Sequence, residues 1–148
     1  MNGRKNIDRA GLAERLRALA PGLDVLGLPA CVLDEDLRYR YVNDAYVAHS
    51  GIAREAFPGR TPDEVFHGTP RDERRLHLAR ALAGETSIFN RRTLEGPHAG
   101  QWVSAHYFPL RGDGATVVGV LVFLVDVQQL KDAEAKLAER ERQLSLIM

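Results

Sequence analysis

The chain has 148 residues, no net formal charge at pH 7 and 45% hydrophobic residues. This length suits one domain with short extensions, and the hydrophobic content is sufficient for a packed core. Balanced charge argues against a nucleic-acid partner, which would need a strongly basic face. The single cysteine, Cys31, excludes an internal disulfide framework and leaves too few thiolates for a structural zinc site.

The apolar segments are short. The longest run, residues 117–125, falls well below the roughly 20 residues that span a bilayer. The basic N-terminus lacks the apolar stretch of a secretory signal. We therefore expect a cytoplasmic protein that does not insert into membranes.

The N-terminal segment is predicted to contain a disordered tail at residues 1–7, followed by an amphipathic helix and linker at residues 8–27. The predicted helix runs from Asp8, a plausible N-cap, to Ala20, and Pro21 with Gly22 should end it. One narrow apolar stripe runs along it. Its members are Leu12, Leu16 and Leu19. Such a helix needs a surface on which to lie.

Two short strands are predicted next, at residues 30–33 and 38–42, joined by an acidic turn as a hairpin. Asn43 or Asp44 should cap a helix that extends to His49 and ends at Ser50 and Gly51. Thr61 should cap a short turn at residues 63–66. The strongest helix of this region is predicted from Pro70 to Ala83. Its expected apolar face comprises Leu76, Ala79, Leu82 and Ala83.

The hydrophobic period then changes to two. Strand-like runs cover residues 86–94, 101–110 and 116–125, separated by glycine-rich turns. The order of elements predicts an α+β fold with a five-stranded antiparallel sheet and short helices on one face. The last strand is apolar at almost every position, so both of its faces should be covered, one of them by the N-terminal helix or by a second subunit.

The final segment, residues 128–148, is predicted to be one amphipathic helix. Leu130, Leu137 and Leu144 recur every seven residues, which is typical of a coiled coil of marginal length. A helix folded back on its own domain is the alternative. Because the pattern stops abruptly at Met148, we expect the chain to be part of a longer protein with an output domain beyond it.

The order and spacing of several short motifs over about residues 28–128 resemble the PAS sensory domain family. The motifs are CVLDEDLRYRYVN at 31–43 with the helix start Asn43-Asp44-Ala45-Tyr46, GRTPDEVF at 59–66, ALAGE at 81–85, WVSAHYFPLRGDG at 102–114 and GVLVFLVDVQQLKDAEAKL at 119–137. The resemblance implies a PAS domain at residues 28–127 followed by a signalling helix.

Three residues are implied in signal relay by this resemblance. Asn43 lies where a strand becomes a helix and can cap that helix. Asp126 ends the last strand, and its carboxylate would favour the N-terminus of the outgoing helix. The family commonly has threonine after this Asp-Val pair, whereas Gln128 stands here. A hydroxyl therefore cannot make the usual contact between strand and helix.

No catalytic or cofactor motif is evident. The five histidines form no metal-binding motif, and no glycine-rich phosphate loop occurs. Cys31 is expected to be a buried hydrophobic residue. The Asn-Cys-Arg-Phe motif of flavin-binding relatives is absent. Haem-binding relatives use a histidine on the mid-domain helix, but His77 is expected on the rim or surface, next to the apolar stripe rather than on it.

A small pocket between sheet and helices is predicted, and an ordinary filled core is the alternative. Which face of the strand at residues 101–110 points inward is left open. Arginines 38, 40, 91 and 92 are candidates to meet an anionic ligand. The candidate lining residues are Tyr41, Tyr46, His49, Phe66, Phe89, His106 and Tyr107, with Tyr39, Trp102 and Phe108 as further aromatic candidates.

The sequence thus predicts a sensory module without enzymatic activity of its own. It would bind an unidentified small molecule or a partner and act on a covalently linked histidine kinase or cyclic-dinucleotide enzyme. A homodimer is expected through the N-terminal helix, the sheet face and the C-terminal helix, with contacts at Leu12, Leu16, Leu19, Leu130, Leu137 and Leu144. The alternatives are a ligand-free dimerisation domain, a haem sensor through His77, or a small isomerase-type enzyme.

Overall fold

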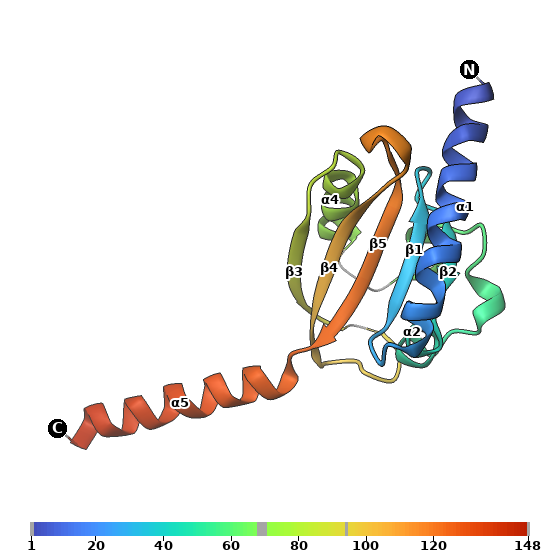
Figure 1. Cartoon of the computed structure of the whole chain (residues 1–148). Helices are drawn as coiled ribbons and strands as arrows, with labels where there is room; N and C mark the ends of the chain where they lie inside the picture. Colours follow the sequence, from blue (N-terminus) through green and yellow to red (C-terminus); the bar gives the residue numbers. More distant parts are fainter. Residues whose placement is uncertain (1, 68–70, 94, 148) are drawn as a thin grey trace.

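A computed structural model describes residues 2–67, 71–93 and 95–147, with side chains from residue 10 onward. Its centre is a five-stranded antiparallel sheet in the order β2-β1-β5-β4-β3 (Figure 1). The predicted α+β fold with one such sheet is confirmed. The predicted limits at Pro70, Leu94 and Met148 lie outside the described residues.

The elements follow one another in chain order with short connections. They are α1 (Asn2–Val25), β1 (Ala30–Asp34), β2 (Tyr39–Val42), α2 (Asp44–Ser50), η1 (Arg54–Ala56), α3 (Pro62–Val65), α4 (Arg71–Leu82), β3 (Ser87–Arg92), β4 (Trp102–Arg111), η2 (Asp113–Ala115), β5 (Val117–Asp126) and α5 (Gln128–Ile147).

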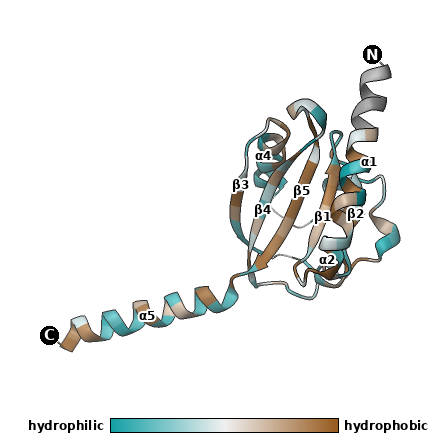
Figure 2. Ribbon diagram, viewed as in Figure 1, coloured by the Kyte–Doolittle hydropathy of each residue, from teal (hydrophilic) through white to brown (hydrophobic). Residues whose placement is uncertain are grey.

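The sheet separates two hydrophobic clusters, because its side chains alternate between faces. On β1, Cys31 and Leu33 join the inner cluster with residues of α2 and α4, whereas Ala30 and Val32 join the outer cluster beneath α1. Figure 2 shows how strongly hydrophobic β5 is between these layers. Alternation also settles the orientation of β4: Ala105 and Tyr107 belong to the inner cluster.

The local caps form where the sequence predicts them. The Asn43 side chain accepts a hydrogen bond from the Tyr46 backbone N–H, and Gly51 ends α2 in the left-handed conformation with φ 70°. The Thr61 hydroxyl accepts from the Glu64 backbone N–H and begins α3. These predictions depend on interactions between near neighbours in the chain.

Helix α1 differs from its prediction in length and in role. Its backbone is helical from Asn2, so the predicted disordered tail is wrong from that residue on, while Met1 lies outside the described residues. Extending a helix that is already anchored avoids a new nucleation cost. Pro21 lies inside the helix rather than ending it, because Leu12 and Leu23, 4% and 6% exposed, hold both parts of the helix against the sheet.

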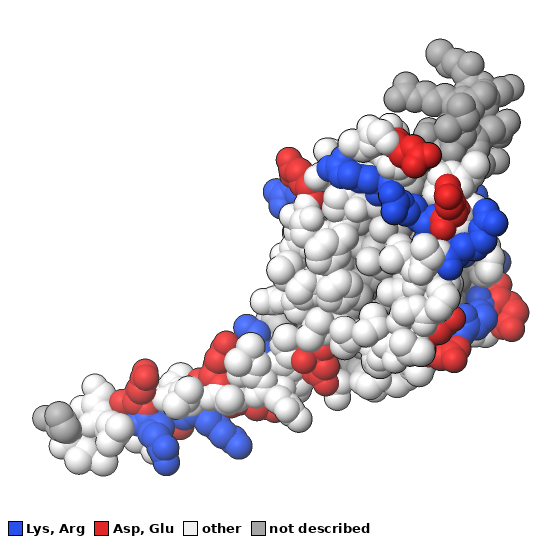
Figure 3. Space-filling view, viewed as in Figure 1, with Lys and Arg blue, Asp and Glu red and all other residues white. Residues whose placement is uncertain are grey.

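The outer face of the sheet is therefore covered partly by its own chain. Leu12, Leu16 and Leu19 pack in the outer cluster of their own domain, and their expected role as dimer contacts stays a prediction. Helix α1 also packs on Val118 of β5, but much of β4 and the later part of β5 is not covered by any described helix, and Figure 3 shows few charged side chains there. His106, Phe108 and Phe123 stack on this face with ring centroids 4.7–6.4 Å apart.

Helix α5 leaves the domain at the end of β5 and projects away from it (Figure 1). Leu130, Leu137 and Leu144 are 57%, 59% and 56% exposed. The helix does not fold back on its own sheet. Its apolar seam therefore has no partner within the described part of the chain.

Candidate functional site

A cavity of about 50 Å³ lies between the inner sheet face and helices α3 and α4. Such a volume holds a few water molecules or a very small organic molecule. Its walls are mostly apolar and aromatic, with two arginines. The lining residues are Cys31, Leu33, Tyr39, Tyr46, Pro62, Phe66, Arg74, Leu78, Arg91, Tyr107, Val122 and Leu124.

A pair of tyrosine hydroxyls forms the polar part of one wall. The hydroxyls of Tyr39 and Tyr46 lie 2.8 Å apart in a hydrogen bond, and both rings pack edge-on against Phe57. Burial raises the pKa of both tyrosines well above the usual value, so both stay protonated. Burial also raises the pKa of Cys31 to about 12, which makes its thiol a poor nucleophile.

The two arginines of the cavity differ in their partners. The Nη2 of Arg74 on α4 lies 2.6 Å from the Asp63 carboxylate of α3, which Arg75 also contacts at 2.7 Å. Burial by itself would raise the pKa of Asp63. The hydrogen bonds and charges of Arg74 and Arg75 outweigh this effect, so the pKa lies below its usual value. Arg91 on β3 has a buried Nη1 without a hydrogen-bond partner among the described residues.

His77 occupies the buried face of α4, which corrects the expected rim or surface position. It is 8% exposed, whereas Leu76, expected on the apolar face, is 48% exposed. The His77 ring stacks on Phe89 and Tyr107 at centroid distances of 5.1 and 5.2 Å. Its Nδ1 lies 2.8 Å from the Ser87 hydroxyl. Burial, followed by the charge of Arg80, lowers its pKa below the usual value.

The residues present do not fit the cofactors known for related domains. His77 does not line the cavity, and about 50 Å³ is far too small for a haem. The ring faces of His77 are already stacked on aromatic neighbours. The single cysteine, Cys31, lies on β1 and not on a mid-domain helix, so no thiol is placed for a flavin adduct.

The predicted pocket residues are distributed over several places. Tyr46, Phe66 and Tyr107 line the cavity, and Phe89 packs behind them on His77. The remaining three lie elsewhere, as a correction to the prediction: Tyr41 packs with the outer cluster, His106 stacks on Phe123 of the outer face, and His49 borders a second hollow.

Arg91 was one of four arginines that the sequence marked for an anionic ligand, and alternation along β3 separates it from Arg92. Ser87, Phe89 and Arg91 are partly buried, whereas Ile88, Asn90 and Arg92 are exposed. Because Arg91 lies two residues after Phe89 on the same strand, an inward Phe89 predicts that Arg91 also faces inward. Arg74 gave no comparable signal, because the apolar face of α4 was assigned one residue out of place.

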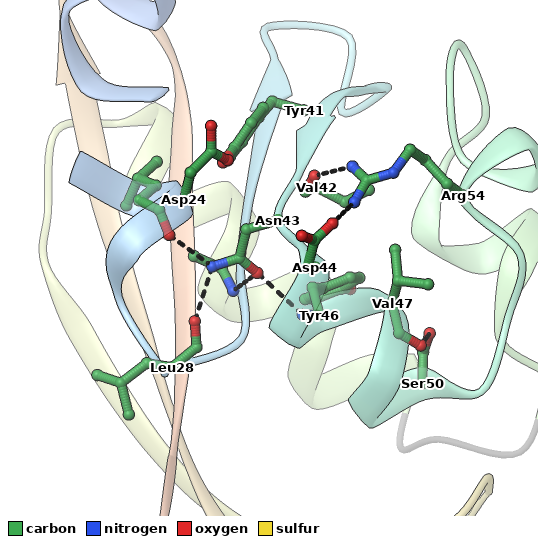
Figure 4. Close-up of polar contacts among 12 residues, drawn as sticks. Asp24, Leu28, Tyr41, Val42, Asn43, Asp44, Tyr46, Val47, Ser50 and Arg54 are labelled. Atoms are coloured by element: carbon green, nitrogen blue, oxygen red, sulfur yellow. Dashed lines mark hydrogen bonds and ion pairs between the residues drawn. The ribbon is translucent and has the colours of Figure 1, made fainter. Parts of the chain in front are cut away.

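Asn43 connects four segments of the chain (Figure 4). It is 1% exposed. Its side-chain oxygen accepts from the backbone N–H groups of Ala30 and Tyr46, both at 2.9 Å. Its amide nitrogen donates to the carbonyls of Leu23 and Leu28 at 2.9 and 2.8 Å. The end of α1, the linker, β1 and the start of α2 thus share one buried amide.

The junction between β5 and α5 is held by side chains of both. The Asp126 carboxylate accepts from the Gln128 backbone N–H at 2.9 Å. The Gln128 side-chain oxygen accepts from the Trp102 backbone N–H of β4 at 2.8 Å. The Lys131 ammonium lies 4.8 Å from the centroid of the Trp102 ring. Gln128 thus links the last strand, its neighbour and the outgoing helix without a hydroxyl.

A second hollow, of about 300 Å³, borders this junction. His49 and His98 stack there with centroids 4.8 Å apart, and Asp126 lies on its wall. Burial, followed by the charge of His98, lowers the pKa of His49 to about 4. His49 is therefore neutral at pH 7.

Two features are absent from the described residues. These residues contain no group of three or more His, Cys, Asp or Glu side chains placed to hold a metal ion. None of the described helices combines the length and the apolar character that crossing a membrane requires.

Comparison with known proteins gives one family. The family model described as the PAS fold matches residues 23–132. No curated protein matches the sequence significantly.

Solved structures share the fold at low sequence identity. An RNA-binding light-oxygen-voltage receptor is 19% identical with a TM-score of 0.65; the match covers 84% of this chain and 38% of the receptor, so this chain spans well under half of its length. A sensory box sensor histidine kinase from Vibrio cholerae is 18% identical, with a TM-score of 0.58 and coverages of 81% and 97%. The N-terminal domain of a diguanylate cyclase with a PAS/PAC sensor from Marinobacter aquaeolei is 14% identical, with a TM-score of 0.56 and coverages of 70% and 98%.

Proposed function

This chain belongs to the PAS family, and we propose that it is a cytoplasmic sensory module that binds a small ligand and relays the change through α5 to an output domain. The output domain would be a histidine kinase or a cyclic-dinucleotide enzyme. Similar domains occur in a sensor histidine kinase and a diguanylate cyclase, which supports this proposal. In this proposal the module itself catalyses no reaction.

The junction at Gln128 is the observation that carries this proposal. The inner face of β4 lines the cavity through Tyr107, and the same strand begins at Trp102, whose N–H donates to Gln128. A ligand that shifts β4 would therefore change the contact that orients the first turn of α5. Because α5 projects from the domain, a small rotation at this point would move its far end by a larger distance.

A homodimer is the second part of the proposal. The uncovered outer face carries half-buried Phe108 and Phe123, and Ile88 on the adjacent strand is 58% exposed. The seam Leu130, Leu137 and Leu144 is exposed as well. Exposed apolar surfaces of this kind mark interfaces, and a two-fold dimer is the commonest arrangement. A second copy would cover both surfaces at once.

A ligand-free dimerisation domain is the alternative, and the small cavity volume favours it. Ligand pockets commonly measure about 300 Å³ or more, so a core of this kind resembles a filled one. An isomerase-type enzyme receives less support, because none of the described residues that line the cavity is Asp or Glu. A general base for proton abstraction is therefore missing from its walls.

Native mass spectrometry of the freshly purified chain tests the proposal. We expect a dimer in which each subunit carries the added mass of one small molecule. A dimer of bare subunits would support the ligand-free alternative. Bare monomers at micromolar concentration would contradict both.

A further inference from the structure

The cavity has the charge pattern of an anion site. Its polar lining consists of two guanidinium groups, tyrosine hydroxyls and one neutral thiol, with no carboxylate among the described lining residues. We propose that the cavity binds a small organic monoanion, a carboxylate with a short apolar tail, and that Arg91 is its counter-ion. This inference rests on the proposed ligand-sensing function and names its ligand class.

Arg91 has no ion-pair partner among the described side chains. Its position on β3, opposite Val103 of β4, turns it to the inner face. Its Nη1 is buried without a hydrogen-bond partner, and none of the ion pairs among the described side chains includes it. Arginine cannot relieve this by losing its proton. Arg91 as a whole is partly buried, but a buried N–H group of a cation without a partner is costly, and a bound anion would lower that cost.

Arg74 differs because Asp63 already pairs with it. Of the two lining cations, Arg91 is the one that no described carboxylate contacts, and this fits one negative charge on the ligand. A dianion such as phosphate at neutral pH would itself lack a second counter-ion. A ligand with a single negative charge would match the single positive charge of Arg91, which favours a monoanion.

The tyrosines supply further donors. One hydroxyl of the Tyr39–Tyr46 pair must donate to the other, so the proton of the accepting hydroxyl remains for another acceptor, which is the Cys31 thiol or a ligand when that hydroxyl belongs to Tyr46. Burial keeps both protonated. A carboxylate accepts several hydrogen bonds and donates none, which makes it complementary to this wall.

The rest of the lining limits the other end of the ligand. Leu33, Leu78, Val122 and Leu124 present only methyl and methylene groups. A tail of a few carbon atoms would bury against them and gain roughly 0.8 kcal/mol for each methylene group. The volume of about 50 Å³ excludes a large tail unless α3 and α4 move apart.

Isothermal titration with propionate and with the isosteric neutral propionamide tests the charge requirement. We expect the wild-type chain to bind propionate at least tenfold more tightly than propionamide. Arg91→Gln should weaken propionate binding by at least tenfold and leave propionamide binding unchanged. Arg92→Gln is the matched control, because it removes the same charge from the exposed side of β3, and it should bind propionate like the wild type.

A stability measurement covers the case in which a variant folds poorly. Arg91→Met replaces the charge by an apolar side chain of similar length. If Arg91 serves a ligand, this change should raise the melting temperature of the ligand-free chain by about 2–4 °C, because it removes a partly buried charge that has no partner among the described residues. A lower melting temperature would mean that Arg91 is structural and would overturn the inference.

Two outcomes separate this inference from the function on which it rests. If propionamide binds as well as propionate, or if native mass spectrometry finds a neutral or cationic molecule, ligand sensing stands and the anion class is wrong. If neither probe binds at millimolar concentration and the purified subunits carry no added mass, the ligand-sensing function fails as well.

Discussion

The side-chain oxygen of Gln128 accepts a 2.8 Å hydrogen bond from the backbone N–H of Trp102, joining the first residue of α5 to the first residue of β4. The same glutamine donates from its amide nitrogen to Asp132 one turn further along the helix at 2.9 Å. A single side chain thus fixes both the position and the direction of the outgoing helix. Trp102 is the only tryptophan of the chain, so its fluorescence reports on this junction.

Gln128→Ala should loosen the junction without unfolding the domain. We expect a changed Trp102 emission and at least fivefold faster amide hydrogen exchange in the first turn of α5, because one hydrogen bond contributes about 1 kcal/mol. Gln129→Ala is the control, since Gln129 is exposed. Equal exchange rates in the two variants would show that Gln128 does not hold the helix.

Asn43→Ala should destabilise the whole domain. It leaves two backbone N–H groups and two carbonyls without their buried partner. We expect a loss of about 3 kcal/mol or more in the free energy of unfolding by urea. Asn90→Ala, at an exposed position on β3, should change it by less than about 0.5 kcal/mol. A loss below about 1 kcal/mol for Asn43→Ala would contradict this role.

Leu137→Asp should dissociate the proposed dimer while leaving the domain folded, because it places charge in the seam of α5. Sedimentation at micromolar concentration should show at least a tenfold higher dimer dissociation constant. Ala138→Asp adds the same charge outside the seam and should have little effect. A wild-type chain that sediments as a monomer would refute the dimer itself.

Arg140→Leu should have the opposite effect on association. Arg140 interrupts the second apolar row of α5, which Ala133 and Ile147 share with it at seven-residue spacing. Filling this position with leucine should tighten the dimer by about tenfold in the same sedimentation experiment. An unchanged constant would mean that this row lies outside the interface.

His49 should make stability depend on pH. Its pKa is about 4 in the folded chain and about 6.5 when unfolded. Between these values the unfolded state binds a proton that the folded state does not, so stability falls as pH drops from about 6.5 to 4. Allowing for partial solvent exposure, the loss is about 2 kcal/mol.

His49→Gln should remove this part of the pH dependence. The control is His67→Gln, because His67 is exposed. His77 and His106, whose pKa values are also lowered, add to the slope in both variants. The difference between the two variants in urea unfolding at pH 5 and pH 7 therefore isolates His49. Parallel pH profiles would contradict the prediction.

Local patterns in the sequence determined the elements and the family. Caps at Asn43, Gly51 and Thr61 depend on neighbours within a few residues, and strand alternation depends on the pleat, so both can be read from the sequence. Motif order over residues 28–128 then indicated the PAS fold, which the match to residues 23–132 confirms. The sequence singled out Gln128 because it follows the Asp126-Val127 pair. Its hydrogen bond with Trp102 was not predicted.

Only the tertiary structure decided which surfaces meet. Pro21 continues a helix because Leu23 is buried against strands distant in sequence, a gain that local propensity cannot anticipate. His77 faces inward because Phe89 and Tyr107 offer it a stacked site that exists only after β3 and β4 pair. Arg91 was distinguished from the other candidate arginines for the same reason, because only the packed sheet and helices bury its Nη1 without a hydrogen-bond partner among the described residues.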